Sequence, residues 1–246
     1  MHCKNSLLAT VAISAALLAP FAQAATITTL AGTSPTVAGT GLNGAYWNTN
    51  SSMSNNAAAD LASSASPTAT FLAKVVDYGN GGSVLDTTLL SAFLGSNAAN
   101  LSAAGGNTID TSIFRFAGFI NVTQAMDTTA GNNTIDVNFR VGSDDGMRLR
   151  IGGVDVTAYD APRGYGYSAA TASFAGAGLY AVDLLFWENG GYTGVDLQWQ
   201  TGSSTAFQDV ATSSLYSALP ASKVPEPATL ALVGLGFLAA RRVRRC

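Results

Sequence analysis

Two neighbouring aspartates, Asp144 and Asp145, stand at a turn in the sequence FRVGSDDGMRLRI, between segments that alternate apolar and polar residues. An ordinary β-hairpin needs only one Asp-Gly pair at its turn. Two adjacent carboxylates repel each other unless a cation lies between them. The pair is therefore either a solvated turn, in which Asp145 and Gly146 form the tip and Asp144 caps a backbone amide, or half of a metal site.

A second group of residues suited to binding lies in the segment AYDAPRGYGYS, which contains Arg163, Tyr165 and Tyr167. Aromatic rings stack on the C–H faces of sugars, and an arginine can hydrogen-bond their hydroxyl groups. The alternative is that the tyrosines pack a long loop onto the domain. The sequence leaves both interpretations open.

Both ends of the chain have the pattern of targeting signals. At the start, Lys4 precedes an apolar run that ends in the small-residue pattern AQA, which predicts a signal peptide over residues 1–24 and export of the protein. The run is shorter than the roughly 20 residues of a membrane span, which favours cleavage after Ala24 over an uncleaved anchor. At the other end, the triplet Pro225, Glu226 and Pro227 precedes an apolar stretch and an arginine-rich terminus.

This order of Pro-Glu-Pro, apolar helix and arginine cluster resembles the PEP-CTERM sorting signal of Gram-negative bacteria, here over residues 225–246 after a linker at 217–224. The resemblance implies that an exosortase removes the tail near the triplet after export, so that contact with the membrane is transient. It also implies a place beside exopolysaccharide, in biofilms or flocs.

Removal of both signals changes the composition of the chain. The only histidine, His2, and both cysteines, Cys3 and Cys246, lie in the terminal segments. A mature chain of roughly 200 residues then has no Ser-His-Asp triad, no cysteine nucleophile, no zinc site with His or Cys ligands and no disulfide. Its core alone must stabilise it, and a chain of this length buries about 70% of its unfolded surface, so one domain suffices.

The same segment, from Ala25 to about Val224, holds seven Lys and Arg against fourteen Asp and Glu, a net charge of about −7. Binding of nucleic acid or anionic lipid requires clustered cations, so this charge argues against both. An acidic surface suits calcium better than phosphate.

Alternation with a period of two predicts strands along most of the mature chain. Residues 135–141 and 147–151 form one antiparallel hairpin around the aspartates, and residues 180–186 and 195–199 form a second. One short helix is expected within residues 86–101, ending near Gly95, whereas the stretches 51–66 and 95–107 have the composition of loops. Trp47 and Trp199 are expected in the core. The pattern predicts an all-β, antiparallel β-sandwich.

Five segments occur in the order seen in the lectin-like β-sandwich domain named after anthrax protective antigen, which also occurs in yeast flocculins. They are GLNGAYWN, FRFAGFINV, FRVGSDDGMRLRIGG, GLYAVDLLFWENGGYTGVDLQW and FQDVATSSLY. The resemblance covers residues 25–216. The yeast members have disulfides that this sequence lacks.

The resemblance also implies a role for the aspartates. In sugar-binding members the matching pair is joined by a cis peptide and ligates calcium, which in turn holds sugar hydroxyls. Calcium takes about 6 to 8 oxygen ligands. The implied ligands are the side chains of Asp144, Asp145 and Asn189, with carbonyls from residues 190–192, and Tyr192 is expected beside the sugar. Asn189 is equally explained as a left-handed turn residue, and Glu188 is a weaker candidate because its strand phase is expected to direct it to solvent.

The sequence and the resemblance together predict an exported, non-catalytic, calcium-dependent carbohydrate-binding or adhesion protein of the extracellular matrix or cell surface. Its expected partners are an exopolysaccharide or cell-surface glycan and, during sorting, an exosortase. Adjacent carboxylates are too close for a glycosidase pair, which needs about 5 Å or more between them. The alternative is a structural component of a biofilm or floc matrix without a sugar site.

Overall fold

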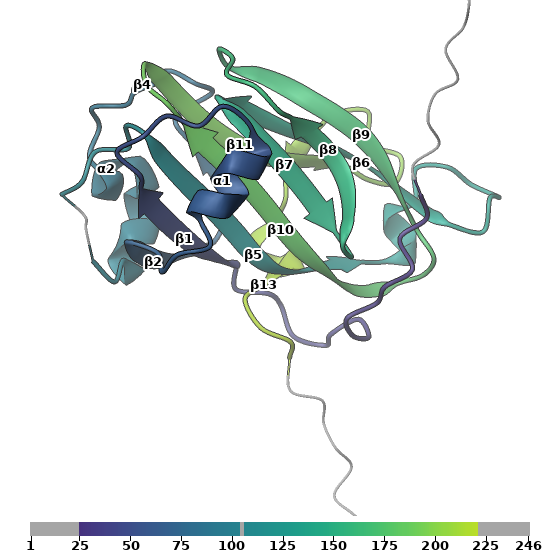
Figure 1. Ribbon diagram of the computed structural model, residues 1–246. Coiled ribbons are helices and arrows are strands. Elements are labelled where there is room, and N and C mark those ends of the chain that lie inside the picture. Colours follow the sequence, from purple (N-terminus) through teal and green to yellow (C-terminus); the bar gives the residue numbers. More distant parts are fainter. Residues whose placement is uncertain (1–24, 104–105, 221–246) are drawn as a thin grey trace, which may run out of the picture.

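Two antiparallel sheets packed face to face form the protein, as the computed structural model in Figure 1 shows for residues 25–103 and 106–220. The first sheet has the strand order β2-β1-β5-β10-β7-β8, with β13 paired to β5. The second has the order β12-β11-β6-β9, with β3 and β4 paired to β11. The expected β-sandwich is therefore confirmed. The predicted signal peptide, the end of the linker and the sorting signal lie outside the described residues.

The strands of the first sheet are β1 (Leu42–Asn48), β2 (Ala69–Ala73), β5 (Ser112–Val122), β7 (Gly146–Ile151), β8 (Val154–Tyr159), β10 (Gly178–Glu188) and β13 (Leu215–Tyr216). Those of the second are β3 (Asp77–Tyr78), β4 (Val84–Leu85), β6 (Ile135–Asp144), β9 (Gly166–Phe174), β11 (Tyr192–Gln200) and β12 (Gln208–Asp209). The strands of both predicted hairpins are present, but the hairpin pairing is wrong: β6 and β11 join the second sheet, whereas β7 and β10 join the first.

The core lies between the sheets and follows the predicted alternation. Val137, Phe139 and Val141 of β6 are fully buried, whereas Asn138 and Arg140 between them reach the outer face. Trp47 and Trp199 are buried, as expected from the sequence. Because the side-chain period of a strand is two, this burial fixes which polar residues of β6 face outward.

A helix that the sequence did not predict, α1 (Asn56–Ala62), lies in the stretch 51–66 expected to be a loop. The side chain of Asn55 caps it by accepting a hydrogen bond from Ala58 N, an arrangement that satisfies one of the free amides of the first turn. Figure 1 shows α1 lying across the strands of the first sheet. Composition failed here because tertiary contacts, rather than an amphipathic pattern, hold this short helix.

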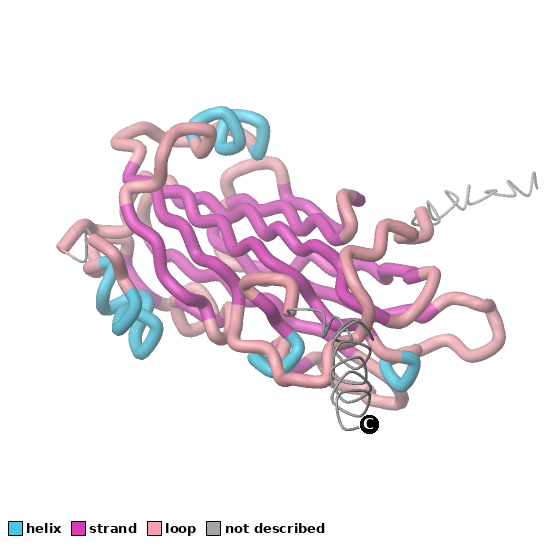
Figure 2. Tube along the Cα trace, turned by 90° about the horizontal axis from the view of Figure 1, so that it is seen from below, coloured by secondary structure: helices cyan, strands magenta, loops and turns pink. Residues whose placement is uncertain are grey.

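The helix predicted within residues 86–101 is confirmed in shorter form as α2 (Leu90–Leu94), which ends at Gly95 with φ 54°. The 3₁₀ helix η1 (Gly95–Asn100) follows it, so the expectation of a loop from residue 95 is wrong in its first part. Two further 3₁₀ turns are η2 (Gln124–Met126) and η3 (Thr212–Ser214). Figure 2 shows the helical pieces at the margins of the strand layers.

Among the described residues, no helix has both the length and the apolar character that crossing a membrane requires.

Candidate functional site

Asp144 and Asp145 lie where β6 passes into β7, at one end of the sandwich. The peptide bond between them is cis, as the resemblance implied. Their exposed fractions are only 7% and 6%. The pair is therefore not a solvated hairpin tip: the polypeptide crosses from one sheet to the other here, and neighbouring loops cover both carboxylates.

Backbone amides from two loops bind these carboxylates. Arg163 N donates to Asp145 Oδ1 at 2.9 Å, and Tyr165 N donates to Asp144 Oδ2 at 3.1 Å. Asn189 N donates to Asp145 Oδ2 at 2.9 Å. Because one loop contacts both aspartates, the two carboxylates lie on the same side of the chain, and the second loop closes over Asp145.

The electrostatics of the pair are unfavourable to two full negative charges. Burial, followed by repulsion from Asp145, raises the pKa of Asp144 to about 6. Burial also raises the pKa of Asp145, although amide hydrogen bonds from Arg163 and Asn189 oppose the shift. The guanidinium of Arg163 does not neutralise them directly, since it donates to the hydroxyls of Ser143 and Ser168.

Glu188 adds a third buried carboxyl group beside the aspartates. Its side chain is fully buried, Oε1 accepts a hydrogen bond from Gly190 N, and Oε2 has no hydrogen-bond partner. Burial raises the pKa of Glu188 to about 8, and the charges of Asp145 and Asp144 add to the shift. The expectation that Glu188 faces solvent is wrong, because it shares the inward phase of Phe186 and so points between the sheets.

Asn189 does not have the left-handed backbone conformation of the predicted turn residue. Positive φ angles occur at Gly190 and Gly191, with values of 148° and 99°, and not at Asn189. The side-chain amide of Asn189 faces Met53, donating from Nδ2 to Met53 O at 2.9 Å and accepting from Met53 N at Oδ1. A role for Asn189 as a calcium ligand stays a prediction, and it requires Oδ1 to be shared with Met53 N.

The predicted aromatic residues divide into two kinds. The Tyr165 hydroxyl donates to Asp196, and its ring lies against Gly142 and Gly82, where a β-carbon would collide with it. Tyr165 is therefore a packing residue. Tyr167 and Tyr192, in contrast, are 47% and 58% exposed, and the Arg140 guanidinium covers one face of the Tyr167 ring.

Arg163, the remaining predicted ligand residue, stacks over the Tyr159 ring with its guanidinium carbon 4.1 Å from the ring centre. It shapes the loop that covers the aspartates and is only half-buried.

The donor set at this end of the sandwich is compatible with a hard divalent cation. It consists of carboxylate oxygens, one of which, Glu188 Oε2, is buried without a partner. Such an atom is costly to bury unless an ion or water meets it. No three Asp, Glu, His or Cys side chains in the described ranges converge closely enough to hold an ion by themselves. A calcium ion on Asp144 and Asp145 would need amide, carbonyl, water or ligand oxygens to complete its coordination.

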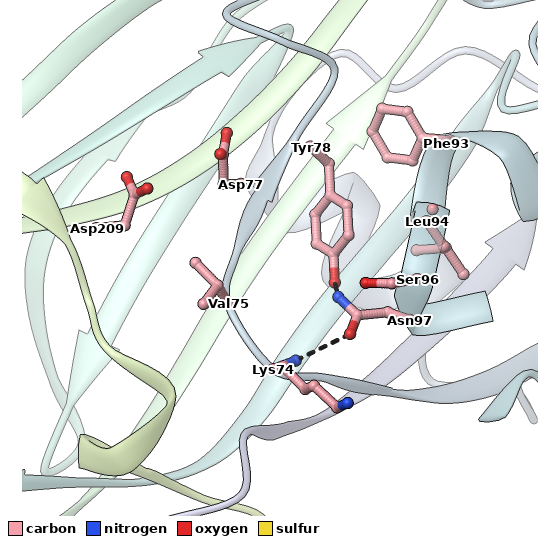
Figure 3. Close-up of a pocket in the computed structure, with 10 residues that line it drawn as sticks. Lys74, Val75, Asp77, Tyr78, Phe93, Leu94, Ser96, Asn97 and Asp209 are labelled. Carbon is pink, nitrogen blue, oxygen red and sulfur yellow. Dashed lines mark hydrogen bonds between the residues drawn. The ribbon is translucent and has the colours of Figure 1, made fainter. Parts of the chain in front are cut away.

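A cavity of about 430 Å³ lies elsewhere, between β3 and the α2–η1 segment. Figure 3 shows the Tyr78 ring reaching the Asn97 amide, with Asp77 and Asp209 on the opposite side and Lys74 at the rim. Asn97 Nδ2 donates to the Tyr78 hydroxyl at 2.9 Å, so these two polar groups of the cavity lining are hydrogen-bonded to each other. None of the site residues predicted from the sequence lines it.

The tail and the sandwich each resemble a different group of known proteins. Residues 223–245 match the PEP-CTERM protein-sorting motif, which confirms the interpretation of the tail from Pro225, Glu226 and Pro227. No curated protein matches the chain in sequence.

Solved structures match the sandwich itself. The PA14 domain of the antifreeze protein MpAFP is 23% identical with a TM-score of 0.64, over 78% of this chain and 97% of that domain. A PA14 sugar-binding domain from an RTX adhesin is 20% identical with a TM-score of 0.58, over 74% and 99%. The chain has the PA14 fold. The A domain of epithelial adhesin 6 from Candida glabrata, solved with Galβ1-3GlcNAc, matches at 14% identity with a TM-score of 0.52, over 80% and 96%.

Proposed function

We propose that this protein is an exported, non-catalytic adhesin that binds carbohydrate in a calcium-dependent manner through the end of the sandwich around Asp144 and Asp145. The observation that carries the proposal is the buried acidic pair, which two loops bind through backbone amides and to which no cationic side chain of the described residues binds directly. Calcium bound there would neutralise the pair and present open coordination positions to vicinal hydroxyl groups.

The surroundings of the pair support a sugar as the ligand. Tyr192 and Tyr167 offer exposed rings on loops or strands adjoining the acidic pair. Rings of this kind contribute stacking area, while the ion fixes the hydroxyl groups. The PEP-CTERM motif supports export and processing by an exosortase, and two of the similar solved structures are a sugar-binding domain from an RTX adhesin and an epithelial adhesin domain solved with Galβ1-3GlcNAc.

A second candidate is a structural component of the extracellular matrix that uses the same sandwich without a sugar site. The arrangement of Asn189 favours it, because its side chain binds Met53 instead of facing the aspartates. In that case the amide hydrogen bonds to Asp144 and Asp145 serve to hold the crossing between the sheets.

A glycan array probed with the full-length protein separates the two candidates. With calcium present we expect binding to a restricted set of glycans, and with excess chelator we expect that binding to be lost. Binding that persists unchanged in chelator would contradict the calcium-dependent site. Absence of any glycan binding, together with a melting temperature that calcium does not change, would favour the structural role.

A further inference from the structure

Arg140 on the outer face of the second sheet differs in its surroundings from the other arginines of the described chain. Arg115, Arg148 and Arg150 form ion pairs with aspartates on or beside the first sheet, and Arg163 is bound by serines. Within residues 25–103 and 106–220, no carboxylate comes within ion-pair distance of Arg140. Its one side-chain hydrogen bond runs from Nε to Gln198 Oε1 at 2.7 Å, leaving Nη1 and Nη2 without an acceptor.

The guanidinium of Arg140 is held in place by two aromatic rings. Its central carbon lies 4.0 Å from the centre of the Tyr167 ring and 4.5 Å from that of Phe207. Three separate segments, β6, β9 and the turn before β12, therefore converge on one side chain. A planar cation fixed in this way has little conformational freedom left to lose on binding. Its two Nη atoms match the two oxygens of a carboxylate.

A row of neutral polar groups lies beside this cation on the open sheet face. Asn138 Nδ2 donates to Gln200 Oε1 at 3.0 Å, and Thr171 donates to Asn138 Oδ1 at 2.6 Å, so a row of amides and hydroxyls crosses three strands. Three aspartates share this face: Asp209 accepts from Gln198, Asp196 accepts from Tyr165 and Tyr167, and Asp77 pairs with Asp196 across β3 and β11.

We propose that this face is a second, calcium-independent binding platform for a carboxylated polysaccharide, with Arg140 binding a uronate carboxylate between the Tyr167 and Phe207 rings. The unoccupied Nη atoms of Arg140 select the occupant. Among the described residues it is the one arginine with neither an ion pair nor a hydrogen bond from its Nη atoms, so it offers a single site for one carboxylate and not the clustered cations that a nucleic acid requires. The amide and hydroxyl row suits the hydroxyl groups of the neighbouring sugars.

Affinity electrophoresis of the full-length protein through gels containing polygalacturonate, with excess EDTA, tests this platform without the calcium site. We expect retardation by polygalacturonate and not by the carboxyl-reduced polymer. Arg140→Gln should weaken binding by about tenfold or more, because a hydrogen-bonded ion pair is lost. Phe207→Ala should weaken it several-fold. Arg150→Gln is the matched control, because it removes the same charge from the first sheet, and it should bind like the unaltered protein.

Ala169→Glu provides an independent route that leaves Arg140 in place. Ala169 is exposed and pairs directly with Arg140 across β9 and β6. The new carboxylate should therefore form an ion pair with the Arg140 guanidinium and abolish retardation of the protein by polygalacturonate. Thermal melting of each variant checks folding. Unchanged binding by folded Arg140→Gln, equal binding of the carboxyl-reduced polymer, or equal losses in Arg150→Gln would overturn the proposal. Equally tight binding to polyglutamate would overturn the assignment to a glycan.

Discussion

At the scale of single residues, the notable feature is that backbone N–H groups, rather than cationic side chains, meet the charges of Asp144 and Asp145. Amide hydrogen bonds leave lone pairs on a carboxylate oxygen, so an ion can still bind. An arginine in the same place would have closed the site. The guanidinium of Arg163, from the loop that covers the aspartates, is bound instead by Ser143 and Ser168.

The first prediction concerns calcium at this pair. Millimolar calcium should raise the melting temperature of the protein, and at a hundredfold excess over Kd the stabilisation is about 2.7 kcal/mol. Asp144→Ala or Asp145→Ala should abolish both this rise and any glycan binding, as measured by differential scanning calorimetry and the glycan array.

Asp77→Asn is the control for that experiment, since Asp77 is an exposed acid of β3 that forms no ion pair or side-chain hydrogen bond with any described residue. Asp136 is a poorer control than its place on the polar strand face suggests, because it is buried and bonded to Asn132 and Thr134. A calcium-induced rise that survives in both aspartate variants would place the ion elsewhere.

The second prediction separates the two tyrosines of the covering loop. Tyr165→Ala removes a packed ring and its hydrogen bond to Asp196, and should lower the free energy of unfolding by about 2 kcal/mol. Tyr167→Ala removes an exposed ring and should change stability by less than about 1 kcal/mol. Urea unfolding of the two variants measures both values. Equal losses would mean that both rings belong to the core.

At the scale of elements, the attachment of α1 to the first sheet organises one side of the site. Asn56 at its start donates from Nδ2 to Met147 O at 3.0 Å and accepts from Trp187 Nε1 at 2.8 Å. Asp60, one turn later, binds both Nη atoms of Arg148 at 2.6 and 2.9 Å. The helix thereby holds the preceding residue Met53 against Asn189.

The third prediction follows from the buried position of Asn56. Asn56→Ala leaves the buried indole N–H of Trp187 without a partner and removes the hydrogen bond to Met147 O, and should cost about 2 to 3 kcal/mol of unfolding free energy. The comparison variant Asn55→Ala removes only the helix cap, at a cost of about 1 kcal/mol. Chemical denaturation measures both, and a smaller loss in Asn56→Ala than in Asn55→Ala would contradict the assigned anchoring.

The fourth prediction concerns pH and Asp60. The hydrogen bonds from Arg148 hold the pKa of Asp60 below its ordinary value. A lowered pKa in the folded state stabilises the protein above the unfolded-state value of about 3.9, and this contribution is lost as the pH falls through the lower folded-state value. Asp60→Asn should therefore be less stable than the unaltered protein at pH 7, and the difference should shrink below about pH 4. A difference that stays constant from pH 7 to pH 3 would contradict this.

Periodicity predicted the strands β6, β7, β10 and β11 and their inward faces because burial of one face imposes a period of two, but it could not show that each expected hairpin divides between the two sheets. The same period, applied through Phe186, would have placed Glu188 in the interior. Helix α1 had no such signal, since its anchors are Met147 and Trp187, far away in the chain. The platform around Arg140 could not be predicted from the sequence either, because Phe207 contacts Arg140 from a turn before β12, far away in the chain.

At the scale of the whole molecule, the acidic pair and the C-terminal strand lie at different ends of the first sheet. Along β5, Ser112 pairs with Glu188 beside the acidic pair, whereas Ile120 pairs with Leu215 of β13. Eight residues of strand separate these points, roughly 26 Å. Figure 1 shows β4, which adjoins the start of β11 at the acidic end, at the upper left and β13 below.

The fifth prediction concerns processing. The mature protein should begin near Ala25 and end near the Pro-Glu-Pro triplet at residues 225–227, because a signal peptide and the PEP-CTERM motif flank the sandwich. Intact-mass measurement of protein recovered from the medium or the envelope tests this. Recovery of an extracellular form that retains the arginine-rich terminus would contradict it.

The separation of these two ends has a mechanical consequence. If a ligand held beside Glu188 is pulled against a force applied at the C-terminal end of the sandwich, the tension runs along β5 and β10, whose paired residues extend from Ser112 and Glu188 to Val122 and Gly178. Hydrogen bonds across such a long ladder are loaded in shear and share the force. The short ladder of β13 has only two such pairs, so it is the element expected to yield first, while the ligand-holding end stays folded.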